Sequence, residues 1–463
     1  MGSGFLGVPA GFLEAGVLLG TAVLIGVTWM QWSAACLLAQ VISRAHALVT
    51  AKAAEATLTP TLVPFAKLGD DSLSSHHHRA PPIALLVPSH TSYELIVLCR
   101  LHLGRWIERG VMISVSLYQF GSLWSYVSVF ASSMAATVPL PWLQAGEPCD
   151  IYKSEVYGGG CITLYYFWVL SFGTLMVAIL AIDVGEQALF QCCMTAARTV
   201  IMTTMVLSLV LGERSDFGLP PAPPRTLDSL PLVRWSGLST MAPIGVFCQL
   251  FQVGVPSLLQ PAARKQHFAR IFGGALTCTM CMYTALGVAA VWRLGNDIDP
   301  SCNLNWDSYR SPVVGLAVSL FPAVDCLSVF PMNAIFLSNN VMASVFQQRW
   351  HAGTIRRRTR YMWRLLCCLP PFVCAILFPS LTKALNFTGI VGIVLPFIVT
   401  PMLVFASLHE CRAMWGRDSF EEAERVAGYS VACIASPAVS GLVGFIGVVL
   451  LIYCVGCGLL YGF

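Results

Sequence analysis

Long apolar runs separated by short charged stretches make up almost the whole chain. A run of about 20 predominantly apolar residues can cross a bilayer as a helix, and a window of about 19 residues locates such runs. The pattern predicts an all-α polytopic membrane protein with eleven spans, the first of them interrupted. The predicted spans are residues 4–16, 18–43, 107–137, 161–182, 187–211, 236–258, 270–292, 312–343, 362–379, 386–407 and 436–462.

The first apolar run contains too many glycine and proline residues for one regular helix. Gly2, Ser3, Gly4, Pro9 and Gly16 all fall within it. Unpaired backbone groups in hydrocarbon are costly, so a broken helix persists only where protein or a water-filled cavity satisfies those groups. Broken helices at membrane depth are typical of transporters.

The loops between the predicted spans alternate in charge. Lysine and arginine concentrate in one set of loops, which the positive-inside rule places in the cytoplasm. Acidic residues predominate in the other set, which we expect to face the exterior or a lumen, so the N-terminus is cytosolic and the C-terminus is outer. The basic loops carry Arg44, Lys52, Lys67, Arg79, Arg100, Arg105, Arg109, Arg264, Lys265, Arg270, Arg349, Arg356, Arg357, Arg358, Arg360 and Arg364, and the acidic loops carry Glu147, Asp150, Glu155, Asp216, Asp228, Asp297, Asp299 and Asp307.

Two short sequences beside the membrane have modest implications. The run from Arg356 to Arg358 with Arg360 directly precedes the ninth span. Such a run either anchors to anionic lipid or sets the topology, and the second role is sufficient to explain it. The sequon at Asn386 opens the tenth span on the outer side, where its closeness to the bilayer disfavours a glycan.

The spans divide the chain into three regions. Residues 1–47 hold the first two spans, residues 48–106 form the main extramembrane segment, and residues 107–463 hold spans three to eleven. Within 48–106, an Ala/Thr/Pro/Ser-rich first half predicts a disordered linker, and residues 91–106 predict an amphipathic helix on the membrane surface. Residues 409–434 predict a solvated cytoplasmic helix.

Composition supports this class and excludes others. The 463 residues are 56% apolar and only 11% charged, with a mean hydropathy of +0.71, whereas soluble domains carry about 25% charged residues. The net charge of +4 therefore reports topology and not nucleic-acid binding. The sequence holds no P-loop, nucleophile elbow or metalloprotease helix, so we expect no enzyme and no ATP-driven pump.

Histidines and cysteines give weaker signals. His76, His77, His78 and His90 could hold Zn²⁺, but a solvated tract explains them better, and no metal or other cofactor is expected. Most of the 18 cysteines lie inside apolar runs, where they pack as core. Cys149 and Cys302 instead fall in polar outer loops, so a disulfide between them and a pair of separate thiols both remain open.

Four stretches carry a resemblance to a known family. They are Gly2-x-Gly4-x-x-x-x-Pro9-x-x-Phe12-x-x-Ala15-Gly16, the stretch from Tyr93 to Gly121, the stretch from Gly245 to Ser257 with the following Arg264-Lys265, and the stretch from Leu320 to Asn340. In this order they resemble the amino acid/auxin permease superfamily, and within it the transmembrane protein 104 subgroup. The resemblance implies a LeuT-type bundle, in which two inverted five-helix repeats enclose a midplane site between the interrupted first and sixth helices.

The resemblance also implies that the first half of helix one is missing, because the glycines at the start match the centre of that helix. We expect the full-length transcript to encode an upstream apolar segment of about 12 residues that ends at Met1. The first region then holds the second half of helix one together with helix two.

A substrate with a carboxylate and an ammonium group needs donors and acceptors, which the ends of half-helices provide. The expected donors are the amides of Gly2, Ser3 and Gly4, with Gln252 to Gly254 as the facing set, although glycines also serve helix packing. Phe251 either closes over the substrate or packs in the core. Tyr118, Gln119 and Ser122 contact either the substrate or neighbouring helices.

Asp325 is an acid well inside the eighth span, with Ser328 almost one turn later. An intramembrane carboxylate is by default an ion or proton site, so both residues are candidates for binding the coupling ion, H⁺ or Na⁺. Alternatively, Asp325 forms a structural ion pair or lies nearer the interface. Arg198 is the obvious partner and Glu14 is another candidate, although Glu14 could also face a vestibule.

These observations predict a secondary active transporter of amino acids or related zwitterions, coupled to H⁺ or Na⁺ by alternating access. The alternative is a non-transporting amino-acid sensor or scaffold with the same fold. The expected partners are a small-molecule substrate and the lipid bilayer, without nucleic acid. The expected location is the plasma membrane or an endolysosomal or vacuolar membrane.

Overall fold

The computed structural model describes residues 3–58, 85, 87–88, 93–138, 140, 149, 151–152, 160–181, 188–221, 231–260, 262, 264–346, 355–427 and 436–461. Within these residues all regular secondary structure is helical. The α-helices are α1 (Val8–Ala15), α2 (Val17–Leu58), α3 (Leu95–Leu103), α4 (Arg105–Thr137), α5 (Gly160–Ile179), α6 (Ala188–Leu211), α7 (Leu238–Gln249), α8 (Val255–Leu259), α9 (Phe268–Arg293), α10 (Pro312–Val345), α12 (Arg357–Leu377), α13 (Leu381–Val394), α14 (Thr400–Trp415), α15 (Arg417–Ala427) and α16 (Pro437–Tyr461). A π-helical turn, η11 (Leu395–Val399), joins α13 to α14.

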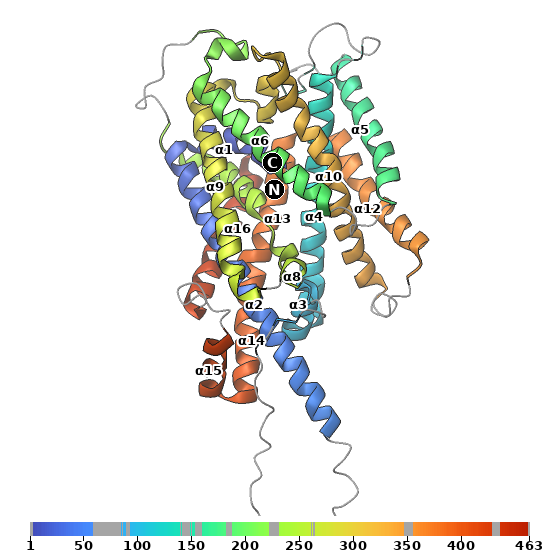
Figure 1. Ribbon diagram of the computed structural model, residues 1–463, viewed down its shortest axis with the longest axis vertical. Helices are drawn as coiled ribbons and strands as arrows, with labels where there is room; N and C mark the ends of the chain where they lie inside the picture. Colours follow the sequence, from blue (N-terminus) through green and yellow to red (C-terminus); the bar gives the residue numbers. More distant parts are fainter. Residues whose placement is uncertain are drawn as a thin grey trace, which may run out of the picture.

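The helices form an elongated bundle (Figure 1). Eight of the described helical segments are long and apolar enough to cross a membrane: Val17–Ala54, Gly160–Ile179, Gln191–Leu211, Lys265–Arg293, Pro312–Met342, Arg357–Leu377, Leu381–Trp415 and Pro437–Leu460. The chain is therefore an integral multi-pass membrane protein, as predicted. The segment Gly4–Ala15 is apolar but shorter, and the total of eleven spans and the inverted repeat stay predictions.

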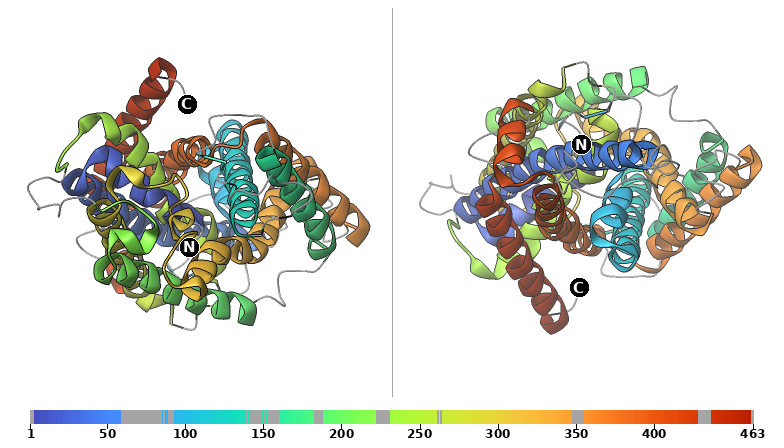
Figure 2. Two further views of the ribbon diagram at one scale, coloured as in Figure 1. Left: turned by 90° about the horizontal axis from the view of Figure 1, so that it is seen from above. Right: turned by 90° about the horizontal axis from the view of Figure 1, so that it is seen from below.

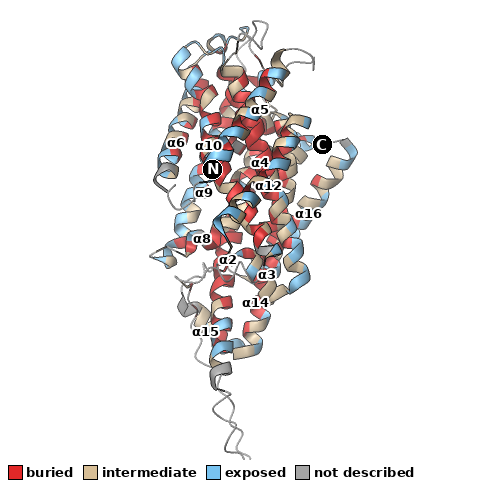
Figure 3. Ribbon diagram, turned by 90° about the vertical axis from the view of Figure 1, so that its right-hand side faces the viewer, coloured by how far each residue is buried: buried red, intermediate tan, exposed pale blue. Residues whose placement is uncertain are grey.

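The pattern of buried and exposed side chains distinguishes the central helices of the bundle from the outer ones. In α4 nearly every residue from Tyr118 to Ser133 is buried, and α4 packs against α10 and α13. The outer helices α5, α6, α12 and α16 instead expose large apolar residues such as Leu170, Val200, Leu366 and Phe445. Figure 3 shows this contrast between a buried centre and exposed outer helices. Since exposed apolar surface is favourable only next to lipid, the outer helices are the ones that face the bilayer.

The extramembrane part differs from the prediction in one respect. A linker was expected from residue 48, but α2 continues as a helix to Leu58 and extends beyond the bundle together with α15 (Figure 1). Arg44 accounts for part of this, because it forms an ion pair with Glu424 of α15 and donates hydrogen bonds to Gln40 and Ser407. Alanine-rich sequence from Ala45 to Ala54 also favours a helix here.

The two predicted extramembrane helices exist, but both pack on protein. The predicted amphipathic helix 91–106 contains α3, whose buried residues Leu95, Leu98 and Cys99 belong to the main core cluster. These residues of α3 pack against α4 and α14, and a position at the membrane surface stays a prediction. The predicted solvated helix 409–434 contains α15, whose Phe420 is fully buried.

The structure answers the open question about Cys149 and Cys302, which do not form a disulfide with each other. Cys149 forms a disulfide with Cys161, with a Cα–Cα distance of 5.1 Å. Cys161 is the second residue of α5, at the start of a span, so a thiol assigned to the membrane lies beside the preceding loop. Cys302 is a free, fully buried thiol in the turn η10 (Cys302–Trp306). The histidine tract at residues 76–78 and 90 lies outside the described residues.

Candidate functional site

The sixth predicted span is broken into two helices. α7 ends at Gln249, the next two residues Leu250 and Phe251 leave the helical conformation, and the turn η7 (Gln252–Gly254) leads into α8. The break was expected at Gln252 to Gly254 and falls two residues earlier. The last carbonyls of α7 and the first amides of η7 have no partners along a continuous helix, so this segment can present both acceptors and donors.

The start of the chain packs against the last turn of α7. The first described element is η1 (Ser3–Gly7), near mid-height of the bundle (Figures 1 and 3). At Gly4, an added Cβ would lie 2.7 Å from Phe247 Cδ1 and 2.9 Å from Cys248 Sγ. η1 and the end of α7 therefore lie side by side, and a side chain at position 4 would force Phe247 and Cys248 to move. Gly2 and the side chain of Ser3 lie outside the described residues.

Tyr118 joins this contact from α4. Its ring centroid lies 6.3 Å from that of Phe247, and Gly392 of α13 packs on the same tyrosine ring. We name Gly4, Tyr118, Phe247, Cys248 and Gly392 the central cluster. Sequence reasoning did not single out Phe247, although its position just before a break in an apolar helix was a signal.

Of the predicted substrate residues in and beside the break, Phe251 and Gln252 make contacts that hold the fold together. Phe251 stacks on Phe272 of α9, with centroids 5.0 Å apart. The buried Gln252 donates from Nε2 to the Ala34 carbonyl at 3.1 Å and to Thr400 Oγ1 at 3.0 Å. An added Cβ at Gly254 would have only one neighbour, Leu258, at 3.8 Å, so close packing does not require glycine there.

Two polar residues of α4 also make local or incomplete contacts. Ser122 donates to the carbonyl of Tyr118 at 3.0 Å, one turn back on its own helix. Gln119 is buried, and its Oε1 atom has no hydrogen-bond partner. An unpaired polar atom inside the bundle is costly. Gln119 follows Tyr118 of the central cluster in the sequence, and its Oε1 atom can accept a hydrogen bond.

Asp325 lies in α10 and forms a buried ion pair with Arg198 of α6. Arg198 Nε lies 3.1 Å from Oδ1 and 3.2 Å from Oδ2, and Nη2 also donates to Oδ1. The two side chains are 4% and 2% exposed, so the charges are shielded from water and interact strongly. Of the two partners considered from sequence, the structure brings Arg198 to Asp325.

Ser328 lies almost one turn after Asp325 on α10, and its hydroxyl interacts with that residue. Its Oγ atom donates to the main-chain carbonyl of Asp325 at 2.8 Å, and Gln191 of α6 donates to the Ser328 carbonyl at 3.0 Å. The ion pair and the hydrogen bond from Gln191 therefore connect α6 with α10.

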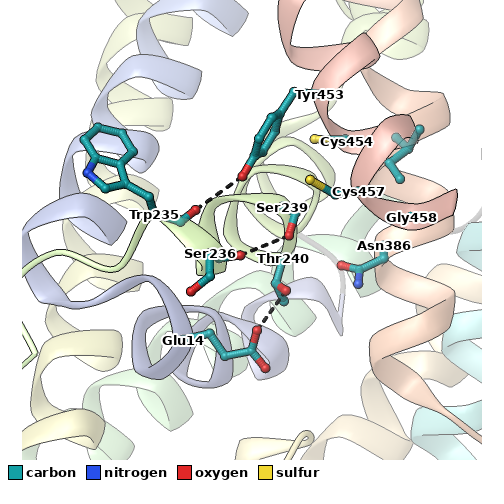
Figure 4. Close-up of a pocket in the computed structure, with 11 residues that line it drawn as sticks. Glu14, Trp235, Ser236, Ser239, Thr240, Asn386, Tyr453, Cys454, Cys457 and Gly458 are labelled. Atoms are coloured by element: carbon teal, nitrogen blue, oxygen red, sulfur yellow. Dashed lines mark hydrogen bonds between the residues drawn. The ribbon is translucent and has the colours of Figure 1, made fainter. Parts of the chain in front are cut away.

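Glu14 lies elsewhere, in a cavity of about 510 Å³ between α1, α7, α13 and α16. Figure 4 shows its carboxylate accepting a hydrogen bond from Thr240 Oγ1 at 2.8 Å. Asn386 of the sequon and the thiols of Cys454 and Cys457 also line this cavity. Glu14 thus faces a vestibule, one of the two roles considered from sequence, and lies apart from Asp325. Among the described residues, no group of three or more His, Cys, Asp or Glu side chains could hold a metal ion.

Comparison with known proteins gives one family match and relatives of similar length. The profile of the family described as "Transmembrane amino acid transporter protein" matches residues 83–452. Transmembrane protein 104 of Mus musculus is 22% identical over 451 residues, which cover 90% of this chain and 86% of the mouse protein. The human protein of that name is 22% identical over 452 residues, with the same two coverages. The transmembrane protein 104 homolog of Dictyostelium discoideum is 20% identical over 456 residues, covering 88% of this chain and 86% of that protein. The resemblance inferred from the sequence is confirmed.

Proposed function

The chain belongs to the transmembrane amino acid transporter family, and on that premise we propose that it is a secondary active transporter of amino acids or related small zwitterions. Transport is coupled to H⁺ or Na⁺ by alternating access in a LeuT-type bundle of eleven spans. The observation that carries the proposal is the broken segment α7–α8 packed against η1 through Gly4.

The break supplies the chemistry that a zwitterion requires. A carboxylate binds to backbone amides at a helix N-terminus, and an ammonium group binds to carbonyls at a helix C-terminus. We assign the substrate to the main chain around Gly2, Ser3 and Gly4 and to Leu250 and Phe251, beside Tyr118 and Phe247. Gln252 then holds the surrounding helices through Ala34 and Thr400, Ser122 bonds within its own helix, and Gly254 belongs to the turn at the break.

We assign coupling to Asp325, with Arg198 as its internal counter-ion and Ser328 as the residue that fixes the backbone at Asp325. A coupling cation or proton would compete with the Arg198 guanidinium for the carboxylate. Because the pair bridges α6 and α10, such competition would loosen the contact between these helices. This gives the ion a structural effect, which coupling requires.

Uptake of labelled amino acids into proteoliposomes tests the proposal. We expect concentrative uptake when a proton or sodium gradient is imposed, and equilibration only when the gradient is collapsed. Protein-free liposomes and the Phe247→Ala variant are the controls, and that variant should lose most of the uptake because it removes one face of the central cluster. Absence of flux for all amino acids under both gradients, with ligand binding retained, would contradict transport.

A sensor or scaffold is the second candidate. It is favoured by the folded extramembrane platform that α2, α3 and α15 form through the Arg44–Glu424 ion pair and the buried Phe420. A platform of this kind could present occupancy of the site to another protein. Binding without flux, together with substrate-dependent protection of α15 from proteolysis, would support a sensor or scaffold over a transporter.

We place the protein in the plasma membrane or an endolysosomal or vacuolar membrane.

A further inference from the structure

A second cavity lies at the start of α12 and is lined almost entirely by cationic side chains. It measures about 350 Å³ and is bounded by Arg357, Arg358, Arg360, Tyr361 and Arg364 of α12, with Ala181 after α5. We name these residues the arginine cavity. α5 and α12 lie side by side at one edge of the bundle (Figures 1 and 2), so the cavity is peripheral and far in the fold from the central cluster.

Hydrogen bonds to the end of α5 hold the lining side chains in place. Arg357 Nη2 donates to the Ala181 carbonyl at 3.3 Å, and Arg364 Nη1 donates to the Leu180 carbonyl at 3.0 Å. Tyr361 Oη donates to the Val177 carbonyl at 2.7 Å. These carbonyls belong to the last turn of a helix and need external donors. The cavity is thus pre-organised by the same contacts that cap α5.

Within the part of the chain that the structure describes, three of the four lining arginines have no ion-pair partner. No carboxylate of the described chain lies within ion-pair distance of Arg357, Arg358 or Arg360. The Nε atom of Arg360 is buried and has no hydrogen-bond partner. A buried guanidinium donor without an acceptor is unfavourable, so the site is complete only with an anion that brings several acceptor oxygens.

An exposed apolar surface continues directly from the cavity along α12. Met362, Leu366, Leu369, Val373 and Leu377 recur at helical spacing and are 45–64% exposed. On α5, Leu170, Leu175 and Val177 are similarly exposed. Arg357–Leu377 is one of the candidate spans, so this stripe faces acyl chains while the arginines lie at the level of the lipid headgroups.

We propose that the arginine cavity binds the phosphorylated headgroup of an anionic lipid, whose acyl chains lie along the exposed stripe of α12 and α5. Planar guanidinium groups match phosphate oxygens bidentately. Three arginines without a carboxylate partner among the described residues favour a headgroup with a phosphomonoester, which carries more charge than a phosphodiester alone. Phosphatidylinositol monophosphate fits this description, and phosphatidylserine does not. The inference does not depend on the transport proposal.

Native mass spectrometry of the full chain in detergent tests the site. The protein is titrated with phosphatidylinositol monophosphate, phosphatidylserine and phosphatidylcholine in separate experiments. We expect retention of the first at concentrations where the other two are lost. The variant Arg358→Gln/Arg360→Gln should weaken that retention roughly tenfold or more, because it removes two charge-assisted contacts.

Arg356→Gln is the matched control, since Arg356 precedes the same helix and is exposed but does not line the cavity. Equal losses in Arg356→Gln and in the double variant would overturn the proposal in favour of diffuse charge. Displacement of the lipid by inorganic phosphate or soluble inositol bisphosphate at equal concentration would support phosphate recognition and overturn lipid as its source.

Transport readouts keep the two proposals separate. Uptake in phosphatidylcholine liposomes without the phosphorylated lipid measures the transporter alone. If lipid retention fails while uptake is present, lipid binding at the arginine cavity is refuted and the transport proposal stands. If uptake fails while retention follows the predicted variant pattern, the transport proposal is refuted and lipid binding at the arginine cavity stands.

Discussion

At the scale of single residues, His102 shows how burial controls a charge in the extramembrane part of the chain. Its side chain is fully buried between α3 and α14, with Nδ1 3.1 Å from Glu410 Oε2. Burial lowers the pKa of His102, and the nearby cations Lys52 and Arg44 lower it as well, while the Glu410 carboxylate raises it. Burial is the largest of these effects, so the folded state favours the neutral imidazole.

This shift predicts a pH-dependent stability. Above the ordinary histidine pKa of about 6.5, both folded and unfolded chains hold His102 neutral, and its contribution to stability is fully present. Below that value the unfolded chain takes up a proton that the folded chain resists, so stability falls with pH until the folded pKa is reached. The melting temperature should therefore drop by a few degrees on acidification, and by less in His102→Gln.

His267→Gln is the control for that measurement. His267 is exposed at the start of α9, and its loss should leave the acid-induced drop in melting temperature unchanged. Identical pH profiles for the wild type and His102→Gln would show that another group causes the drop.

At the scale of helices, the contact between α7 and α13 depends on one glycine. A Cβ added at Gly389 would lie 2.1 Å from the carbonyl oxygen of Pro243. Because the clash is with backbone, a side-chain rotation cannot relieve it, and α13 would have to move away from α7. Gly389→Ala should destabilise the protein by about 1–3 kcal/mol, measured as a lower melting temperature in detergent.

Gly26→Ala gives the matched comparison in α2. An added Cβ there has no neighbour within 4 Å, and alanine is a better helix former than glycine by roughly 0.5–1 kcal/mol. Its melting temperature should be unchanged or slightly higher. A similar fall in both variants would mean that glycine content, and not the α7–α13 contact, sets the stability.

Much of the helical architecture could be predicted because hydropathy directly reflects burial in lipid. The predicted ranges of the longer spans coincide with helices, and the presence of a break in the sixth followed from Gly254 and Pro256. Its register did not, because Gln252 is held by Ala34 and Thr400 through hydrogen bonds that span 218 and 148 residues of sequence. No local pattern contains such contacts.

The candidate site was also predictable only in part. The approach of Gly4 to the sixth span followed from the family resemblance, and Arg198 was one of the two partners considered for Asp325. The role of Phe247, the stacking of Phe251 on Phe272 and the Cys149–Cys161 disulfide depend on which faces of the helices meet. The continuation of α2 to Leu58 similarly depends on Arg44 reaching Glu424 across 380 residues.

At the scale of the whole molecule, the Arg198–Asp325 pair connects α6 with α10 inside the bundle. A neutral residue at either position leaves the other charge buried and unpaired, which typically costs about 3–5 kcal/mol. Arg198→Gln and Asp325→Asn should therefore each lower stability strongly. The double variant Arg198→Gln/Asp325→Asn should be more stable than either single variant, because no bare charge remains.

The same three variants separate a coupling role from a structural one. If Asp325 binds the coupling ion, the double variant should still exchange labelled for unlabelled substrate across proteoliposomes but should no longer concentrate substrate when a proton or sodium gradient is imposed. A purely structural pair predicts a different result, in which the refolded double variant regains gradient-driven uptake along with its stability. An Asp325→Asn variant whose uptake keeps the wild-type dependence on pH and sodium would remove this carboxylate from the coupling step, and the ion pair would then serve only to hold α6 against α10.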